Sequence, residues 1–258
     1  MLMNKAVEVK SREELAVMRR AGAVVADILA LLSAAIKPGM TTGNIDQIAR
    51  EELKKRGAKP AFLNYHGFPG VICVSVNHEV VHGIPSDACV LKEGDIVGLD
   101  FGCVIEGWYA DAAVTVGVGK ISPDAARLIH VTRESLEKGI AAVKAGARIG
   151  DIGAAIQGCA EAAGYSVVRE FVGHGIGRAL HEEPPIPNYG QAGVGQRLKA
   201  GMTLAIEPMV NMGGPEVTTL GDGWTAVTKD RKLSSHFEHT VVVTADGAEI
   251  LTLPSGSI

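Results

Sequence analysis

Four acidic residues lie in parts of the chain that look like strands of a folded core. Asp100 ends an apolar run, and Asp111 follows it across a short turn. Glu207 closes a second apolar run, and Glu238 lies within Phe237–Val243, which is rich in aromatic and β-branched residues. Buried strands seldom carry carboxylates that lack a partner. Carboxylates that converge on one face repel each other unless a cation lies between them, so the pattern predicts a metal site.

The first two carboxylates are related by a predicted hairpin. Glu106-Gly107 suits a two-residue turn, which would place Asp111 opposite Gly102. Because side chains alternate along a strand, Asp100 would then share a face with Asp111, at about 7 Å between β-carbons. The alternative is that one of the two is a loop aspartate that caps its own turn.

An imidazole is also available to this acidic set. Four ionised carboxylates match the charge of two divalent cations, and oxygen ligands favour hard ions such as Mn²⁺, Fe²⁺ or Mg²⁺. His174 lies between Gly173 and Gly175, which let the backbone approach closely. A lone histidine is more often structural, but beside an acidic set we interpret His174 as a ligand. It would shift the preference towards first-row transition metals.

The carboxylates also belong to a weak internal repeat. The segment Leu91–Asp100 resembles Leu198–Glu207, so that Asp100 and Glu207 lie 107 residues apart in equivalent places. The same offset places Lys37, Gly39, Gly43 and Ile45 on Lys144, Gly146, Gly150 and Ile152. We therefore predict one catalytic domain, residues 1–258, built from two similar halves at about 12–116 and 123–245. Each half would supply two carboxylates.

Helices and strands in the same order would position these residues. Helices are expected over about 12–36, 42–56, 123–143 and 151–163, and Ser11 has the sequence context of a capping box. The segments after each helix pair have the short apolar runs and turn residues of strands. No linker or low-complexity tract separates the halves, so the fold class is predicted to be α+β in one compact domain.

Composition excludes several other classes of protein. The 258 residues are 47% hydrophobic with a net charge of −4, which argues against disorder and against a nucleic-acid-binding surface. The four cysteines are widely spaced and form no CxxC pair, as expected of reduced thiols in a cytoplasmic protein. The apolar run at 21–36 is interrupted by Asp27 and is too short to span a membrane.

Longer motifs indicate a resemblance to a known family. The chain resembles the type I methionine aminopeptidases in Tyr65–Pro69, Val81–Pro85, Gly173–Arg178, His181–Pro184, Ile206–Met209, Asp222–Thr225 and Phe237–Thr240. The resemblance covers nearly the whole chain and is closest to the short bacterial form. It implies the pita-bread fold, in which two pseudo-symmetric halves pack helices on a curved antiparallel sheet.

The resemblance also implies roles for individual residues. Two divalent ions (Co, Mn, Fe, Zn or Ni) would be bound by Asp100, Asp111, His174, Glu207 and Glu238. Glu207 would also shuttle a proton, His181 would stabilise the oxyanion, and His82 would contact the scissile amide nitrogen. The substrate pocket would include His82 and His181 together with Tyr65, His66, Phe68, Cys73, Trp224, Phe62 and Leu180. Phe62 and Leu180 depart from residues that some relatives carry, which leaves the fine shape of the pocket open.

The expected activity is hydrolytic removal of the N-terminal methionine from peptides and nascent proteins, with a small second residue preferred. The resemblance further implies a cytoplasmic monomer that meets its substrates in solution or at the ribosome, with no nucleic-acid or membrane partner. Two alternatives remain. One is a proline-specific peptidase of the same fold, although such enzymes usually carry an additional N-terminal domain. The other is a non-catalytic binding protein of this fold, although such proteins generally lose metal ligands.

Overall fold

Four α-helices lie where the sequence predicts them. The computed structural model describes residues 7–256, so the ends of the predicted 1–258 domain lie outside the described part. The helices are α1 (Arg12–Ala35), α2 (Thr42–Lys55), α3 (Pro123–Ala141) and α4 (Ile149–Ala162), with a short 3₁₀ helix η1 (Tyr65–Gly67). Ser11 forms the expected capping box with Glu14 at the start of α1. The helix boundaries agree with the predicted ranges to within about two residues, because caps and prolines mark them locally.

The strands are short apart from one long hairpin. They are β1 (Lys59–Pro60), β2 (Ile72–Val76), β3 (Glu79–Val81), β4 (Ile96–Ile105), β5 (Trp108–Gly117), β6 (Ser166–Val167), β7 (Gly173–Gly175), β8 (Glu182–Ile186), β9 (Thr203–Ile206), β10 (Met209–Asn211), β11 (Val217–Thr219), β12 (Ala226–Thr228), β13 (Ser234–His236), β14 (Glu238–Val243) and β15 (Ala248–Ile250). Every pairing between strands is antiparallel.

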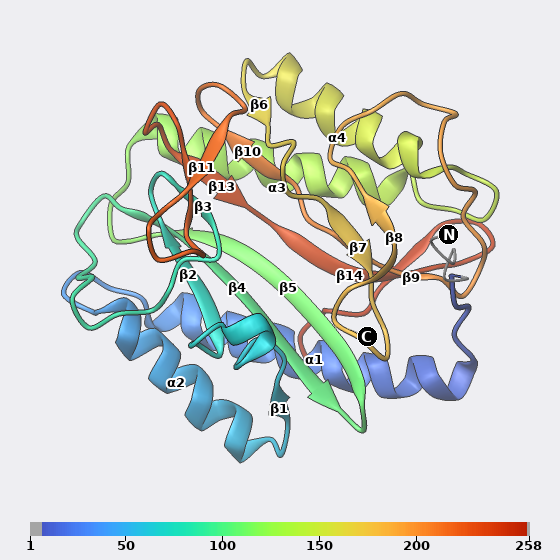
Figure 1. The fold of residues 1–258 in the computed structure, drawn as a ribbon, viewed down its shortest axis with the longest axis horizontal. Coiled ribbons are helices and arrows are strands. Elements are labelled where there is room, and N and C mark those ends of the chain that lie inside the picture. The colour runs from blue at the N-terminus through green and yellow to red at the C-terminus, as the bar shows by residue number, and fades with distance from the viewer. Residues whose placement is uncertain (1–6, 257–258) are drawn as a thin grey trace.

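A curved sheet of nine strands crosses the whole molecule. Its order is β1-β4-β5-β14-β9-β7-β8, with β2 paired to β4 and β15 paired to β14. Two further sheets of three strands each, β13-β10-β6 and β11-β12-β3, adjoin it. In Figure 1, α1 and α2 lie in the lower part of the view, α3 and α4 lie in the upper part, and the strands run between them. The architecture is therefore the predicted α+β arrangement of helices on a curved antiparallel sheet.

The apolar core has one main cluster under each helix pair. One cluster packs α1 and α2 against the hairpin through residues such as Val25, Ile45 and Phe101. The other packs α3 and α4 against β9 and β14 through residues such as Leu128 and Ile152. Burial of large aliphatic side chains contributes roughly 1.5–3 kcal/mol each, so these clusters hold the helices on one side of the sheet. The opposite side is left free for the site.

The predicted hairpin is confirmed. Glu106 and Gly107 both have positive φ, as a two-residue turn of this hand requires, and Gly102 pairs with Asp111. All four cysteines are free thiols. None of the helices within residues 7–256 combines the length and apolar character that a membrane crossing needs.

Candidate metal centre

Strand register brings the acidic residues to a single face of the large sheet. Asp100 and Glu238 both pair with Ala113, which lies two residues from Asp111 on β5. His174 pairs with Ala205, which lies two residues before Glu207. Paired residues share a face in an antiparallel sheet, and so do residues two apart along a strand. The five predicted metal ligands therefore project from one face, although they come from β4, β5, β7, β14 and the end of β9.

Small side chains leave space between these ligands. Ala113 is buried between Asp100 and Glu238, and Ala205 is buried beside His174. A larger aliphatic residue at either position would fill the volume in which the carboxylate oxygens converge. The acidic side chains can therefore approach one another on this face of the sheet.

His174 cannot hydrogen-bond both of the carboxylates that it faces. Its Nδ1 lies 2.8 Å from the carbonyl oxygen of Gly175, which can only accept, so Nδ1 carries the proton. In the neutral ring, Nε2 is then an acceptor, and it lies 3.7 Å from Asp111 Oδ2 and 3.6 Å from Glu207 Oε1. Three acceptors that face one another at these distances are suited to a cation. Asp111, His174 and Glu238 can each offer an atom within 4.8 Å of the others.

Electrostatics of the four carboxylates favour the same conclusion. Burial raises the pKa of Asp100 to about 7 and the pKa of Glu207 to about 8. Burial also raises the pKa of Asp111, and it raises that of Glu238 well above its usual range, with neighbouring carboxylates adding to the shift for Glu238. Without a cation, these groups hold protons that carboxyl groups in water have lost. A divalent ion would displace the protons, so the donor set fits a metal.

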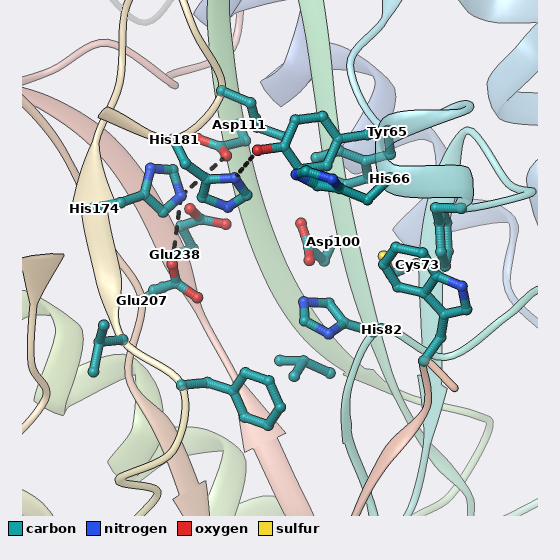
Figure 2. Close-up of a pocket in the computed structure, with 17 residues that line it drawn as sticks. Tyr65, His66, Cys73, His82, Asp100, Asp111, His174, His181, Glu207 and Glu238 are labelled. Atoms are coloured by element: carbon teal, nitrogen blue, oxygen red, sulfur yellow. Dashed lines mark hydrogen bonds and ion pairs between the residues drawn. The ribbon is translucent and has the colours of Figure 1, made fainter. Parts of the chain in front are cut away.

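One cavity of about 310 Å³ contains every residue that the sequence suggested for the site. Figure 2 shows Asp111, Glu207 and Glu238 near His174, with Asp100 between them and Tyr65, His66, Cys73 and His82. Phe62, Phe68, Leu180, His181 and Trp224 complete the predicted lining. The lining also contains Val81, Phe171 and Val172, which sequence reasoning missed. Their apolar side chains carry no chemical signature, so only the fold reveals them.

A loop held by a buried ion pair positions His181. The Tyr65 hydroxyl lies 2.6 Å from His181 Nδ1, and the His181 ring lies 4.3 Å from that of His174. The next residue, Glu182, accepts a hydrogen bond from the almost fully buried Lys10 at 2.7 Å. Its other oxygen accepts from the backbone N–H of Arg178, which closes the loop. Burial, followed by the nearby imidazoles, lowers the pKa of His181 to about 3, so the ring is neutral near pH 7.

The apolar part of the cavity is aromatic. The rings of Phe68 and Trp224 meet edge to face at 5.2 Å, a favourable geometry for an aromatic pair. His82 lies edge to face with Phe171 at 5.3 Å, and burial lowers its pKa to about 4. Cys73 is buried, and burial raises the pKa of its thiol well above the usual value, so it contributes a neutral surface. These residues, Phe68, Cys73, His82, Phe171 and Trp224, form a slot that can accept an uncharged, unbranched side chain beside the acidic centre.

Thr240 supports the centre from within the sheet and was not singled out from the sequence. Its hydroxyl lies 2.8 Å from the carbonyl oxygen of Asp111 and 3.1 Å from Asp111 Oδ1. The backbone N–H of Asp111 in turn donates to the Thr240 hydroxyl oxygen at 3.2 Å. Thr240 is two residues from Glu238 and therefore on the same face of the strand. This spacing in the sequence could have identified Thr240 as a neighbour of the site.

Comparison with known proteins gives one consistent result. Residues 16–245 match the model of metallopeptidase family M24. The chain is 51% identical to the methionine aminopeptidase of Clostridium perfringens over 244 residues, which are 95% of this chain and 98% of that protein. It is similar to the crystal structure of methionine aminopeptidase from Thermotoga maritima, with a TM-score of 0.95 and 49% identity over 96% of this chain and 100% of the other.

A more distant likeness concerns the fold alone. The prolidase of Pyrococcus furiosus has a TM-score of 0.76 at 22% identity, and the match covers 95% of this chain but 65% of that one. Together with the closer structure, it confirms the predicted pita-bread fold. The shared fold by itself carries no preference between methionine and proline substrates.

Proposed function

The chain belongs to metallopeptidase family M24, and from this membership we propose that it removes the N-terminal methionine from peptides and nascent proteins. It is a hydrolase of the aminopeptidase type. The observation that carries the proposal is one cavity in which a cluster of four carboxylates and an imidazole adjoins an uncharged aromatic slot. Near-full-length similarity to a methionine aminopeptidase supports methionine as the residue that is removed from the substrate.

The ligand set supports the use of divalent metal, and we propose that two ions are bound. Asp111, His174, Glu207 and Glu238 would hold one of them, and Asp100 would join Asp111 and Glu238 around the other. Bound divalent ions would polarise the scissile carbonyl and make a water molecule acidic enough to attack it. The residues present do not select among Co, Mn, Fe, Zn and Ni, because cellular supply decides between such ions.

Proton transfer is assigned to Glu207. Its carboxyl group lines the cavity beside His174, where it can take up and release a proton next to the bound peptide. Glu207 would accept a proton from the attacking water and pass it to the amine that leaves. His82, neutral because of its lowered pKa, would accept a hydrogen bond from the N–H of the scissile amide.

Stabilisation of the oxyanion is assigned to His181. The ring is neutral, and a Tyr65 hydroxyl that donates to Nδ1 leaves the ring proton on Nε2. Nε2–H can then donate to the carbonyl oxygen as it gains negative charge, which is where a fixed donor is most effective.

The aromatic slot is proposed to receive the methionine side chain. Phe68, Cys73 and Trp224 would contact the thioether, and Phe62 and Leu180 would close the sides. A fitted apolar side chain contributes about 1–3 kcal/mol to discrimination, so norleucine should also be accepted. We propose that a small second residue is preferred, because Tyr65, His66 and His181 would restrict the space available to the second residue of the substrate. Nascent chains at the ribosome are proposed as one source of substrate.

Peptide release tests the proposal directly. Chelated protein, then protein restored with Mn²⁺, Fe²⁺ or Co²⁺, is incubated with Met-Ala-Ser and with Ala-Pro-Ser. Metal-dependent release of methionine from the first peptide alone is expected. Cleavage of the second peptide alone would make the protein a proline peptidase. Absence of cleavage with every metal would favour a binding protein of this fold.

A further inference from the structure

One buried imidazole beside the metal centre has no part in the mechanism above. His236 is 3% exposed. Among the described residues, only three buried side-chain nitrogen or oxygen atoms lack a hydrogen-bond partner, and His236 Nε2 is one of them. Buried polar atoms are almost always paired, so each exception needs a physical reason. The surroundings of His236 supply one.

The backbone of His236 is fixed from two sides. In β13 it pairs with Met209 of β10, two residues after Glu207. Its N–H donates to Thr115 Oγ1 at 2.9 Å, and its carbonyl oxygen accepts from the same hydroxyl at 2.8 Å. The Cα of His236 is therefore held in place, and its buried ring projects from a fixed point of the sheet.

That nitrogen faces the free oxygen of Glu207. His236 Nε2 lies 3.6 Å from Glu207 Oε2, while Glu207 Oε1 lies 3.6 Å from Nε2 of His174. One carboxylate is thus flanked by two imidazoles, one on each oxygen. The carbonyl oxygen of Glu207 accepts a hydrogen bond from Asn188 Nδ2 at 3.0 Å, which holds the backbone there. Rotation of the carboxyl group is the freedom that remains.

The two imidazoles differ in what they can do. The ring of His174 lines the cavity and faces both Asp111 and Glu207. His236 does not line the cavity, whereas Glu238, two residues further along the chain, does. The position therefore suits a ring that acts on a ligand rather than on the ion.

We propose that His236 is a positioning residue whose Nε2–H donates to Glu207 Oε2, so that Glu207 presents Oε1 to the ion beside His174. The inference rests on the proposed metallopeptidase function and deepens it. A slight rotation of the Glu207 carboxyl group brings the present 3.6 Å separation into hydrogen-bonding range. Donors of this kind orient metal-binding carboxylates, and removing them typically lowers metal affinity about 10–100-fold.

Four variants test whether His236 acts as a hydrogen-bond donor or only fills volume in the core. His236→Gln keeps an N–H donor at similar reach, His236→Leu keeps bulk without a donor, and His236→Asn carries the amide with a shorter reach. Ser235→Ala is the matched control, because Ser235 is the adjacent buried residue in β13 and its hydroxyl is also unpaired. Far-UV circular dichroism and the melting temperature of each metal-free protein establish folding before metal is added.

The main readout is the dissociation constant of Co²⁺, from calorimetry and from the visible spectrum of the bound ion. His236→Leu and His236→Asn are expected to bind Co²⁺ about 10–100-fold more weakly, whereas His236→Gln and Ser235→Ala stay close to the parent protein. Methionine release at saturating metal is then measured for each. Binding by His236→Leu that equals that of the parent protein would overturn the proposal. Equal weakening in His236→Gln and His236→Leu would overturn it too, since the imidazole itself would then be needed.

Metal binding does not depend on which peptide is cleaved. Weakened Co²⁺ binding in a protein that releases no methionine would therefore support the role of His236 and reject the proposed substrate. The experiments can therefore reject the role of His236 and the proposed substrate independently of each other.

Discussion

Two stretches of the chain, 39–94 and 146–201, form the same backbone contacts at an offset of 107 residues. An isolated bridge joins Thr41 to Val90, and another joins Arg148 to Arg197. The N–H groups of Gly39 and Gly146 donate to Leu91 and Leu198, respectively, and Gly39 and Gly146 both have positive φ. Each stretch leads from a second helix, α2 or α4, towards a strand with a carboxylate, which is Asp100 within β4 and Glu207 directly after β9. These pairs support the predicted repeat.

The halves differ in what they add to this frame. The first half turns directly from β4 into β5, whereas the second inserts β10 to β13 between β9 and β14. His174, His181 and His236 come from the second half, as do Phe171 and Trp224 of the aromatic slot, whereas the first half supplies the remaining slot residues Phe68, Cys73 and His82. The comparison indicates that the acidic centre belongs to the shared frame. The imidazoles and the slot residues are additions that differ between the halves.

Removing equivalent carboxylates from the two halves should give the largest effect. Asp100→Asn and Glu207→Gln are each expected to lower kcat/KM at least about 10³-fold, because a bound ion contributes several kcal/mol to the transition state. Metal-free stability should be unchanged or higher, since each variant removes a carboxylate whose pKa is raised by burial. Peptide kinetics and thermal melts measure both quantities.

The control for this pair is Glu249→Gln, which makes the same change in a half-exposed side chain paired with Arg19. It should leave kcat/KM unchanged. If only one of Asp100→Asn and Glu207→Gln lost activity, the two halves would not share the centre.

A residue that belongs to one half alone should separate chemistry from metal binding. His181→Ala is expected to lower kcat about 10²–10³-fold, the typical cost of losing one oxyanion donor. Metal content should stay at the parental value, because the contacts described for the His181 ring are with the His174 ring and the Tyr65 hydroxyl. Kinetics and metal analysis test this, with the exposed His130→Ala on α3 as control. Equal loss of activity and metal would reject the assigned role.

Stability of the metal-free protein should depend on pH because of the shared centre. The pKa of Asp100 is raised to about 7 and that of Glu207 to about 8, so between pH 6.5 and 8.5 the folded protein holds protons that the unfolded chain has lost. These two carboxyl groups together lower stability as pH rises through this window, by on the order of 2 kcal/mol. His78, His82, His181, His236 and His239 oppose this near pH 6.5, because burial lowers their pKa in the folded protein while the unfolded chain still holds part of their protons. The net fall is therefore expected above about pH 7.5, where these histidines are neutral in both states.

Melting temperatures across this range test the expectation. Between pH 7.5 and 8.5 the metal-free protein should lose on the order of 2–4 °C for each kcal/mol of stability at this chain length. Glu207→Gln should flatten the dependence. Stability that rises between pH 7.5 and 8.5 would show that these carboxyl groups are already ionised in the folded state.

The parts of the site that sequence analysis predicted are those fixed by local rules. The register of Asp100 and Asp111 follows from a two-residue turn and an alternation of period two, which both act within twenty residues. The helices follow from caps and prolines in the same way. Glu207 and Glu238 could be predicted because a carboxylate within an apolar run is unusual, whichever strand that run pairs with.

The parts that were missed depend on contacts across the whole chain. Thr240 supports Asp111 from 129 residues away, and Lys10 holds Glu182 from 172 residues away. The place of His236 depends on strands β10 and β13, which no local pattern connects to Glu207. The raised pKa values likewise follow from burial, which composition does not reveal. Distant pairing, rather than residue type, was the information the sequence lacked.

The hydrogen bond that joins the halves gives the smallest expected effect and the most specific one. Tyr65 comes from the first half, and its hydroxyl lies 2.6 Å from Nδ1 of His181 in the second. Tyr65→Phe removes this bond and keeps the ring that borders the slot. One hydrogen bond contributes about 0.5–1.5 kcal/mol, so kcat should fall up to about tenfold while KM for a methionine peptide and Co²⁺ affinity hold. A rise in KM with constant kcat would instead make Tyr65 purely a wall of the pocket.

Two further variants complete this comparison. In a protein that already carries His181→Ala, Tyr65→Phe should have no additional effect on kcat, because the hydroxyl acts through the imidazole. Phe68→Leu alters the slot itself and should raise KM more than it lowers kcat, since Phe68 packs on Trp224 away from His181. If the two changes at 65 and 181 were instead additive, the hydroxyl would act on the substrate directly. The bond between the halves would then be a feature of packing with no part in positioning His181.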